Sequence, residues 1–217
     1  MKQWTYPIGF KWDNGEPANN LTNNILLKYF DKYIDPNKWF IKYTGGEPGL
    51  YPEIAELIPE SSNRGYRGFI ENNGSMYIPK SDNFVRLAAW HYKKPMPKYY
   101  DIILIIENDK DNWQEKVKIL KEKNIPFLTT PLRGGFGKID GRVIDENYPE
   151  TKIKSILHIY SAGQLFSCPE FNKDYGNIFN MDKPIPRKLD NFICKHCTQV
   201  HMIERLYGGK MDKCIYT

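Results

Sequence analysis

Residues 101–107 read Asp-Ile-Ile-Leu-Ile-Ile-Glu, and this nearly unbroken apolar run decides the class of fold. A strand that is buried on both faces of a parallel sheet has such a run, whereas a strand with one wet face alternates apolar and polar residues. A helix is predicted over residues 110–123, where apolar side chains recur at helical spacing, and residues 125–130 form the next strand. This order of strand, helix and strand is typical of parallel α/β proteins.

The same alternation extends toward the N-terminus. Residues 21–34 have one apolar helical face, and residues 39–44 form a short aromatic and β-branched strand. Pro52 opens another predicted helix, and strands are predicted at residues 66–71 and 85–90. The elements together predict an α/β fold, a partial barrel of about five parallel strands with helices outside.

The pattern changes in the last third of the chain. Residues 156–160 and 165–167 predict a β-hairpin, and the segment after Cys168 is rich in turns and prolines with little periodicity. Such a segment buries little core of its own and is typical of a metal-dependent fold. We therefore predict a barrel-like part over residues 1–140 and a small cysteine-containing extension over residues 141–217.

Composition limits the classes of protein that need consideration. The chain has 217 residues, of which 41% are hydrophobic and 26% charged, as in globular proteins. No apolar run approaches the roughly 18 residues of a membrane span, and the start of the chain does not resemble a signal peptide. A cytoplasmic location is therefore expected. The net charge of +5 is mild and dispersed, so it does not indicate nucleic-acid binding.

All four cysteines lie in the last 50 residues, at Cys168, Cys194, Cys197 and Cys214. In a reducing compartment, clustered cysteines indicate a metal or an iron–sulfur cluster before they indicate disulfides. Cys194 and Cys197 are spaced so that one tight turn can place two thiolates on one metal. Four thiolates suit tetrahedral zinc as well as an iron–sulfur cluster, and His196 and His201 could replace a thiolate in a zinc site.

Residues 44–48 read Thr-Gly-Gly-Glu-Pro and follow a predicted strand. The carboxyl end of a strand is where α/β folds place their ligand sites. Glycines let the backbone approach a ligand closely, and the carboxylate of Glu47 can accept a hydrogen bond from a ligand ammonium. The same five residues also suit a plain turn between a strand and a helix.

In its order of elements, this region resembles the core of radical S-adenosylmethionine (SAM) enzymes. The shared order is a strand, Gly-Gly-Glu-Pro, a helix, and a strand that ends in Asn-Gly within residues 68–75. The resemblance implies that Gly45, Gly46 and Glu47, followed by Pro48, hold the amino group of the SAM methionine. It also places residues 87–91 on the strand that lines the SAM pocket, which makes His91 a candidate binding residue beside a purely structural interpretation.

The C-terminal part is similar to the SPASM or twitch extension of radical SAM maturases. The similar segments are residues 163–168, 175–179 and 194–197. The resemblance implies that Cys168, Cys194, Cys197 and Cys214 bind an auxiliary 4Fe–4S cluster, with zinc as the alternative metal.

The chain departs from the family at one essential point. Radical SAM chemistry needs three cysteines, usually spaced Cys-x3-Cys-x2-Cys, after the first barrel strand, and this chain has none before residue 168. Either the chain is truncated and begins after that loop, or residues 4–11 are the first strand and the cluster has been lost. The first explanation is favoured because the order of elements from residue 21 onward is complete. In both cases little or no reductive SAM cleavage is expected of these residues alone.

Two hypotheses of function follow. The first is a radical SAM-type iron–sulfur protein that modifies a peptide or a small molecule when complete, with an electron donor as partner. The second is a non-catalytic, degenerate relative with a structural zinc site that binds a partner.

Overall fold

The computed structural model describes eleven stretches of the chain, which are residues 12–13, 16–17, 21–37, 39–44, 47–91, 93–107, 112–131, 155–159, 164–166, 174–180 and 213–216. The helical segments are α1 (Asn23–Tyr33), the 3-10 turn η1 (Pro48–Leu50), α2 (Ile54–Asn63) and α3 (Trp113–Glu122). The strands are β1 (Trp12–Asp13), β2 (Glu16–Pro17), β3 (Trp39–Tyr43), β4 (Gly68–Asn72), β5 (Phe84–Ala89), β6 (Ile102–Glu107), β7 (Phe127–Pro131), β8 (Ser155–Ile159), β9 (Gln164–Phe166), β10 (Asp174–Asn177) and β11 (Lys213–Tyr216).

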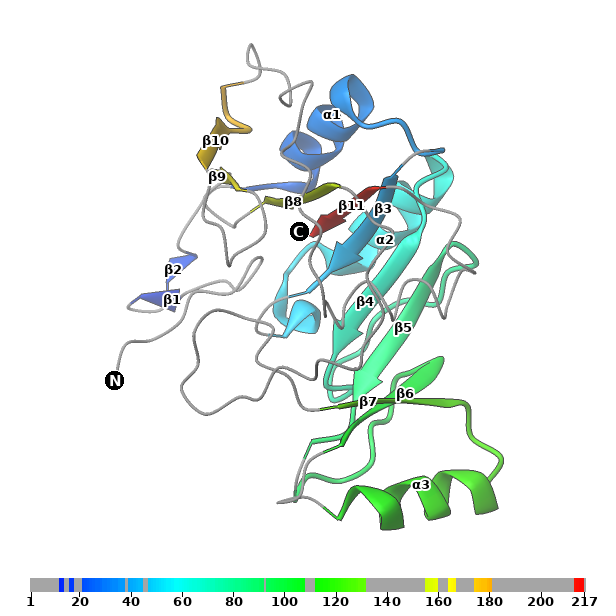
Figure 1. Cartoon of the computed structure of the whole chain (residues 1–217). Coiled ribbons are helices and arrows are strands. Elements are labelled where there is room, and N and C mark those ends of the chain that lie inside the picture. The colour runs from blue at the N-terminus through cyan, green and yellow to red at the C-terminus, as the bar shows by residue number, and fades with distance from the viewer. Residues whose placement is uncertain are drawn as a thin grey trace.

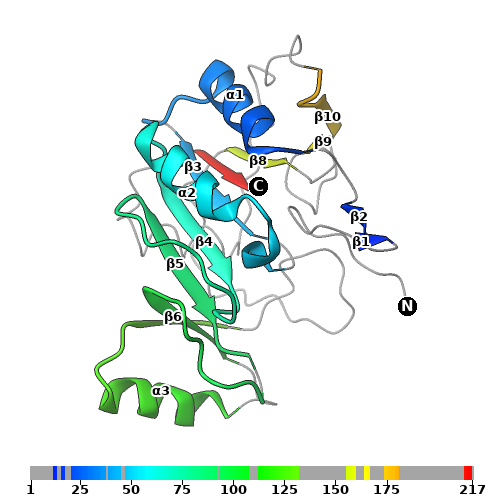
Figure 2. The same cartoon turned by 180° about the vertical axis from the view of Figure 1, so that it is seen from behind.

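Within the described residues, nine strands form one sheet in the order β10-β9-β8-β11-β3-β4-β5-β6-β7, and β1 pairs with β2 separately. All neighbours from β8 to β7 are parallel, whereas β9 and β10 add an antiparallel edge. Helices α1 and α2 cover one face of β3 and β4, and α3 lies against β6 (Figures 1 and 2). The predicted α/β fold with about five parallel strands is confirmed by β3 to β7.

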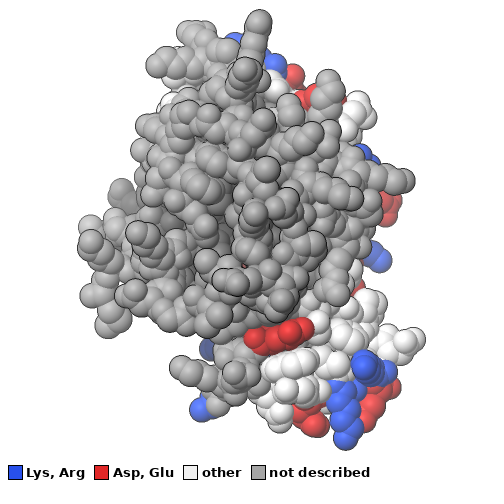
Figure 3. Space-filling view, in the orientation of Figure 1, with Lys and Arg blue, Asp and Glu red and all other residues white. Residues whose placement is uncertain are grey.

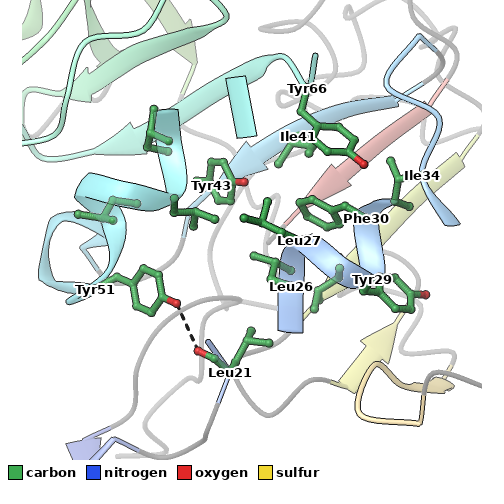
Figure 4. Packing of buried hydrophobic residues seen from close by; sticks show 14 of the residues in the cluster. Leu21, Leu26, Leu27, Tyr29, Phe30, Ile34, Ile41, Tyr43, Tyr51 and Tyr66 are labelled. Atoms are coloured by element: carbon green, nitrogen blue, oxygen red, sulfur yellow. Dashed lines mark hydrogen bonds between the residues drawn. The ribbon is translucent and has the colours of Figure 1, made fainter. Parts of the chain in front are cut away.

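The main core lies between the sheet and the two N-terminal helices (Figure 4). Most of the apolar side chains on the predicted faces of α1 and α2 are buried there, and the others are partly buried. Phe30 and Tyr66 pack edge to face, with ring centroids 5.4 Å apart. The Tyr43 hydroxyl is 2.7 Å from the Ser61 hydroxyl, and burial raises the pKa of Tyr43, so this buried polar pair is satisfied and neutral.

The sequence pattern indicates strands that alternate with helices. The connections from β4 to β5 and from β5 to β6 depart from this pattern. Residues 73–83 and the described residues 93–101 contain no helix. Pro79, Pro95 and Pro97 interrupt these segments, and proline removes a backbone donor that a helix interior needs. The two connections are therefore loops, and both emerge near the carboxyl ends of the strands.

Strand β11 was not predicted, yet it occupies a central place in the sheet. It pairs with β8 on one side and with β3 on the other. Residues 213–216 therefore lie beside a strand that residues 39–43 form. The predicted hairpin is confirmed as β8 and β9. The sheet thus contains strands from both predicted parts of the chain, and the boundary near residue 140 stays a prediction.

A bidentate ion pair between Arg86 and Asp101 connects β5 to the loop that precedes β6. The Arg86 guanidinium donates to both carboxylate oxygens of Asp101, at 3.1 and 2.9 Å, and also to the carbonyls of Ile78 and Tyr100. Burial alone raises the pKa of Asp101, but the hydrogen bonds and charge of Arg86 outweigh it and hold that pKa below its ordinary value. Planar arginine suits this bidentate role, which lysine could not fill.

The outer surface over α3 carries charges of both signs. Figure 3 shows acidic and basic side chains next to one another in this region rather than in separate patches. One pair, Lys118 and Glu122, is an exposed ion pair at 4.0 Å, a kind that contributes little to stability. No helix in the described part of the chain has the length and hydropathy needed to cross a membrane.

Candidate functional site at the carboxyl ends of the strands

The carboxyl ends of β3, β4 and β5 lie side by side, because these strands are parallel neighbours. Glu47 and Pro48 follow β3, and His91 follows β5, so three predicted site residues lie at this edge of the sheet. Gly45 and Gly46 lie outside the described residues. Open α/β sheets bind their ligands at this edge, which makes it the candidate site.

The carboxylate of Glu47 joins the turn after β3 to the turn after β4. Its Oε1 accepts a hydrogen bond from the Gly49 amide at 3.2 Å, and it caps the short helical turn η1, which begins with the buried Pro48. Its Oε2 accepts from the Asn73 amide at 2.9 Å. A single side chain therefore fixes the relative position of two loops at the edge of the sheet.

Glu47 keeps acceptor capacity beyond these two contacts. An ionised carboxylate offers about four lone-pair sites, and the two backbone amides use one site on each oxygen. Its side chain is partly exposed rather than sealed in the core. Glu47 is thus able to accept a further bond from a ligand ammonium while it stays oriented by the backbone.

The turn after β4 is built by two asparagines and a glycine. Asn72 accepts from the Gly74 amide at 2.6 Å, and Asn73 accepts from the Ser75 amide at 2.8 Å. Gly74 has φ +68°, and a Cβ there would lie 2.3 Å from the Cβ of Pro97. The Asn-Gly turn that the sequence predicted is therefore a position that only glycine fills.

A buried ion pair between Lys42 and Glu71 lies directly behind this edge, and the sequence pattern did not predict it. Lys42 is fully buried in β3, and its ammonium contacts the Glu71 carboxylate at the end of β4. Thr44 lies 3.5 Å from the same carboxylate oxygen, and the Phe69 ring lies 5.4 Å from the ammonium. The signal that could have found the pair is a lone lysine within the apolar strand of residues 39–43.

A cavity of about 380 Å³ opens where the turn after β4 meets the loop after β5. It is lined by residues 73–75, Ala89, His91 and residues 94–98. His91 therefore lies on the cavity wall as an exposed side chain, and its carbonyl accepts from the buried Lys116 ammonium at 3.2 Å. Asn73 belongs both to this wall and to the Glu47 contact. The cavity that His91 lines therefore adjoins the turn that Glu47 holds.

Of the predicted metal ligands, only Cys214 lies in the described residues. It is in β11, in register with Phe40 of β3 and Ile156 of β8. Cys168, Cys194 and Cys197, together with His196 and His201, lie outside the described residues. The described part of the chain contains no group of three or more potential metal ligands, so the metal site stays a prediction.

Comparison with known proteins adds one relative. The chain is 29% identical over 116 residues to 7-carboxy-7-deazaguanine synthase of Methanocaldococcus jannaschii. The match covers 46% of this chain and 46% of that protein, so it spans about half of the relative's length. That relative is a radical SAM enzyme. The similarity therefore supports a relationship to the radical SAM superfamily and no finer assignment. No family model matches the chain, and no solved structure matches it significantly.

Proposed function

We propose that the chain is a radical SAM-type protein in which residues 45–48 hold the methionine end of SAM. The observation that carries the proposal is the Glu47 carboxylate, fixed by the amides of Gly49 and Asn73 at the carboxyl edge of the parallel sheet. An oriented anion at this place suits the positively charged amino group of SAM. The partial similarity to 7-carboxy-7-deazaguanine synthase supports the same superfamily.

In this proposal Glu47 accepts a hydrogen bond from the amino group, and the adjoining glycines let the backbone pass close to the ligand. His91, the other predicted SAM-binding residue, lies on the wall of the neighbouring cavity. Bound beside a reduced cluster, SAM would supply a carbon radical. The cysteines of the family's cluster loop are not among these residues, since the first cysteine is Cys168.

The C-terminal cysteines are proposed to bind an auxiliary 4Fe–4S cluster. The donor set of Cys168, Cys194, Cys197 and Cys214 fits this group, because thiolates are the usual ligands of such clusters. The place of Cys214 in β11, next to β3, brings one of the four ligands to the main sheet. Such a cluster would exchange electrons with a donor protein or orient a substrate.

The substrate proposed is a small molecule, with a peptide as the other class. The name of the relative, 7-carboxy-7-deazaguanine synthase, denotes a small-molecule product. The cavity of about 380 Å³ beside Asn73 is of the size that small ligands occupy.

Replacing Glu47 by Gln is expected to weaken binding of S-adenosylhomocysteine, which carries the same amino group as SAM, by about 10-fold or more. The loss of one charge-assisted hydrogen bond, about 1.5 to 3 kcal/mol, accounts for this change. Calorimetric titration of the wild-type protein, Glu47→Gln and Glu47→Ala measures it. Glu56→Gln, on the exposed face of α2, is the matched control and should bind normally. Unchanged affinity in folded Glu47→Gln, or no binding by the wild type, contradicts the proposal.

Anaerobic purification with iron and sulfide is expected to give a brown protein whose broad absorbance near 400 nm bleaches with dithionite, as for other 4Fe–4S proteins. The double variant Cys194→Ser and Cys197→Ser should lose this absorbance and its iron, because two of four ligands are removed. Metal analysis of the two proteins is the measurement. A colourless wild-type protein that retains zinc contradicts the cluster and favours the structural zinc site of a partner-binding protein.

A further inference from the structure

We propose that the cavity between the turn after β4 and the loop after β5 binds the anionic group of a small molecule, a carboxylate or a phosphate, while its apolar wall holds the body of that molecule. This inference goes beyond the proposed function, because anion binding at the cavity requires neither SAM nor a metal.

The charged side chains on the wall are basic. Lys94, Lys98 and His91 line the cavity, and no acidic side chain is among the described residues that line it. All three side chains are exposed toward solvent rather than buried in the core. Two cationic side chains on one concave wall raise the local concentration of anions, and the effect is strongest at low salt.

The rest of the wall is apolar. Ala89, Pro95, Met96 and Pro97 line the cavity beside the basic residues. Methionine adapts its shape to a flat or irregular ligand, and proline presents a rigid apolar surface. The combination of an apolar wall with a few charged groups is typical of small-molecule sites.

The loop that carries both lysines is held in place before any ligand arrives. The indole of Trp90 donates to the Lys94 carbonyl at 2.9 Å, and the Lys98 amide donates to the Gly74 carbonyl at 2.9 Å. The buried Lys116 of α3 donates to the Trp90 and His91 carbonyls at 3.1 and 3.2 Å. A preformed wall lowers the ordering cost of binding, which favours a specific site over a loose surface contact.

The test uses two charged probes and their neutral counterparts at low ionic strength: indole-3-carboxylate with indole-3-carboxamide, and phenyl phosphate with phenol. Binding is followed by nuclear magnetic resonance, with the Trp90 indole N–H as local reporter, assigned by its loss in Trp90→Phe. The charged member of at least one pair is expected to bind about 10-fold more tightly than its neutral counterpart and to shift this signal. A response of the indole pair indicates a carboxylate ligand, and a response of the phenyl phosphate pair indicates a phosphate ligand.

The double variant Lys94→Ala and Lys98→Ala should lose the preference for the charged probes and keep its fold, because the hydrogen bonds of these residues described above come from the backbone. Lys118→Ala with Lys121→Ala on the exposed face of α3 removes the same charge and should bind like the wild type. Equal binding of charged and neutral probes, an unmoved Trp90 signal, or equal loss in both double variants overturns the inference.

A final arm separates the cavity from the SAM site. The charged probes should still bind when S-adenosylhomocysteine is present at saturation. Displacement by S-adenosylhomocysteine would overturn the cavity as an independent site. If the wild-type protein bound the probes but not S-adenosylhomocysteine, the proposed function alone would be contradicted. The failure of the proposed function is therefore distinguishable from the failure of the cavity as a binding site.

Discussion

Replacing Glu71 by Gln is expected to lower the free energy of unfolding by about 3 kcal/mol, because it removes the carboxylate that lies against a fully buried ammonium. Lys42 has no exposed surface, whereas the Glu71 side chain is 23% exposed. Without this carboxylate, more of the cost of burying the lysine charge falls on the folded state. Urea unfolding at neutral pH, followed by circular dichroism, measures the change.

The two partners are expected to respond unequally. Lys42→Met should cost less than Glu71→Gln, because methionine fills the apolar path of the lysine stem and the remaining carboxylate can reach water. The double variant should be more stable than Glu71→Gln alone, since the buried ammonium is removed as well. Glu60→Gln is the matched control, because its pair with Arg64 is exposed and 3.8 Å long. A loss below about 1 kcal/mol in Glu71→Gln would contradict the role of the pair.

Replacing Gly68 by Ala is expected to cost at least about 3 kcal/mol and to leave little folded protein. Gly68 begins β4 and is in register with Ile41 of β3. A Cβ at Gly68 would lie 1.7 Å from the Ile41 carbonyl oxygen, a rigid backbone atom that cannot move without separating the two strands. The yield of soluble protein and its thermal midpoint are the measurements.

Gly65→Ala separates this steric effect from the general cost of replacing glycine. Gly65 has φ +81°, and a Cβ there would meet nothing closer than Pro36 at 3.9 Å. Its replacement should cost only about 1 kcal/mol, from the backbone conformation alone. If Gly68→Ala is no more harmful than Gly65→Ala, the close approach of β3 and β4 is not required.

Both large effects concern the strands that present the candidate site. Lys42 and Glu71 join β3 to β4 just behind the turns that carry Glu47 and Asn73. Loosening this junction is expected to disturb ligand binding as well as stability, so binding assays of these variants need a check of folding first.

Sequence patterns could predict the strands and helices from residue 21 to residue 131 because their signals are local. The apolar run of residues 101–107 indicates a buried parallel strand wherever it occurs, and the helical spacing in α1 and α2 marks the faces that become buried. Glu47 and His91 each follow a predicted strand. That order is enough to bring them to one edge of a parallel sheet.

The sequence did not predict what depends on partners distant along the chain. The lysine at position 42 interrupts an apolar strand, but only the folded sheet shows that Glu71 of β4 lies against it. Strand β11 lies between β8 and β3, a pairing that nothing within residues 213–216 indicates.

The α/β class, the parallel strands β3 to β7 and the residues at their carboxyl ends could be predicted from the amino-acid sequence, because secondary structure and burial follow from local periodicity. The folded structure was needed to show that Glu47 fixes the Asn73 turn, that Lys42 pairs with Glu71, and that Lys94 and Lys98 share a cavity with His91. These contacts depend on which loops the folded sheet brings together, and a hydrogen bond or an ion pair carries no periodic signal along the chain.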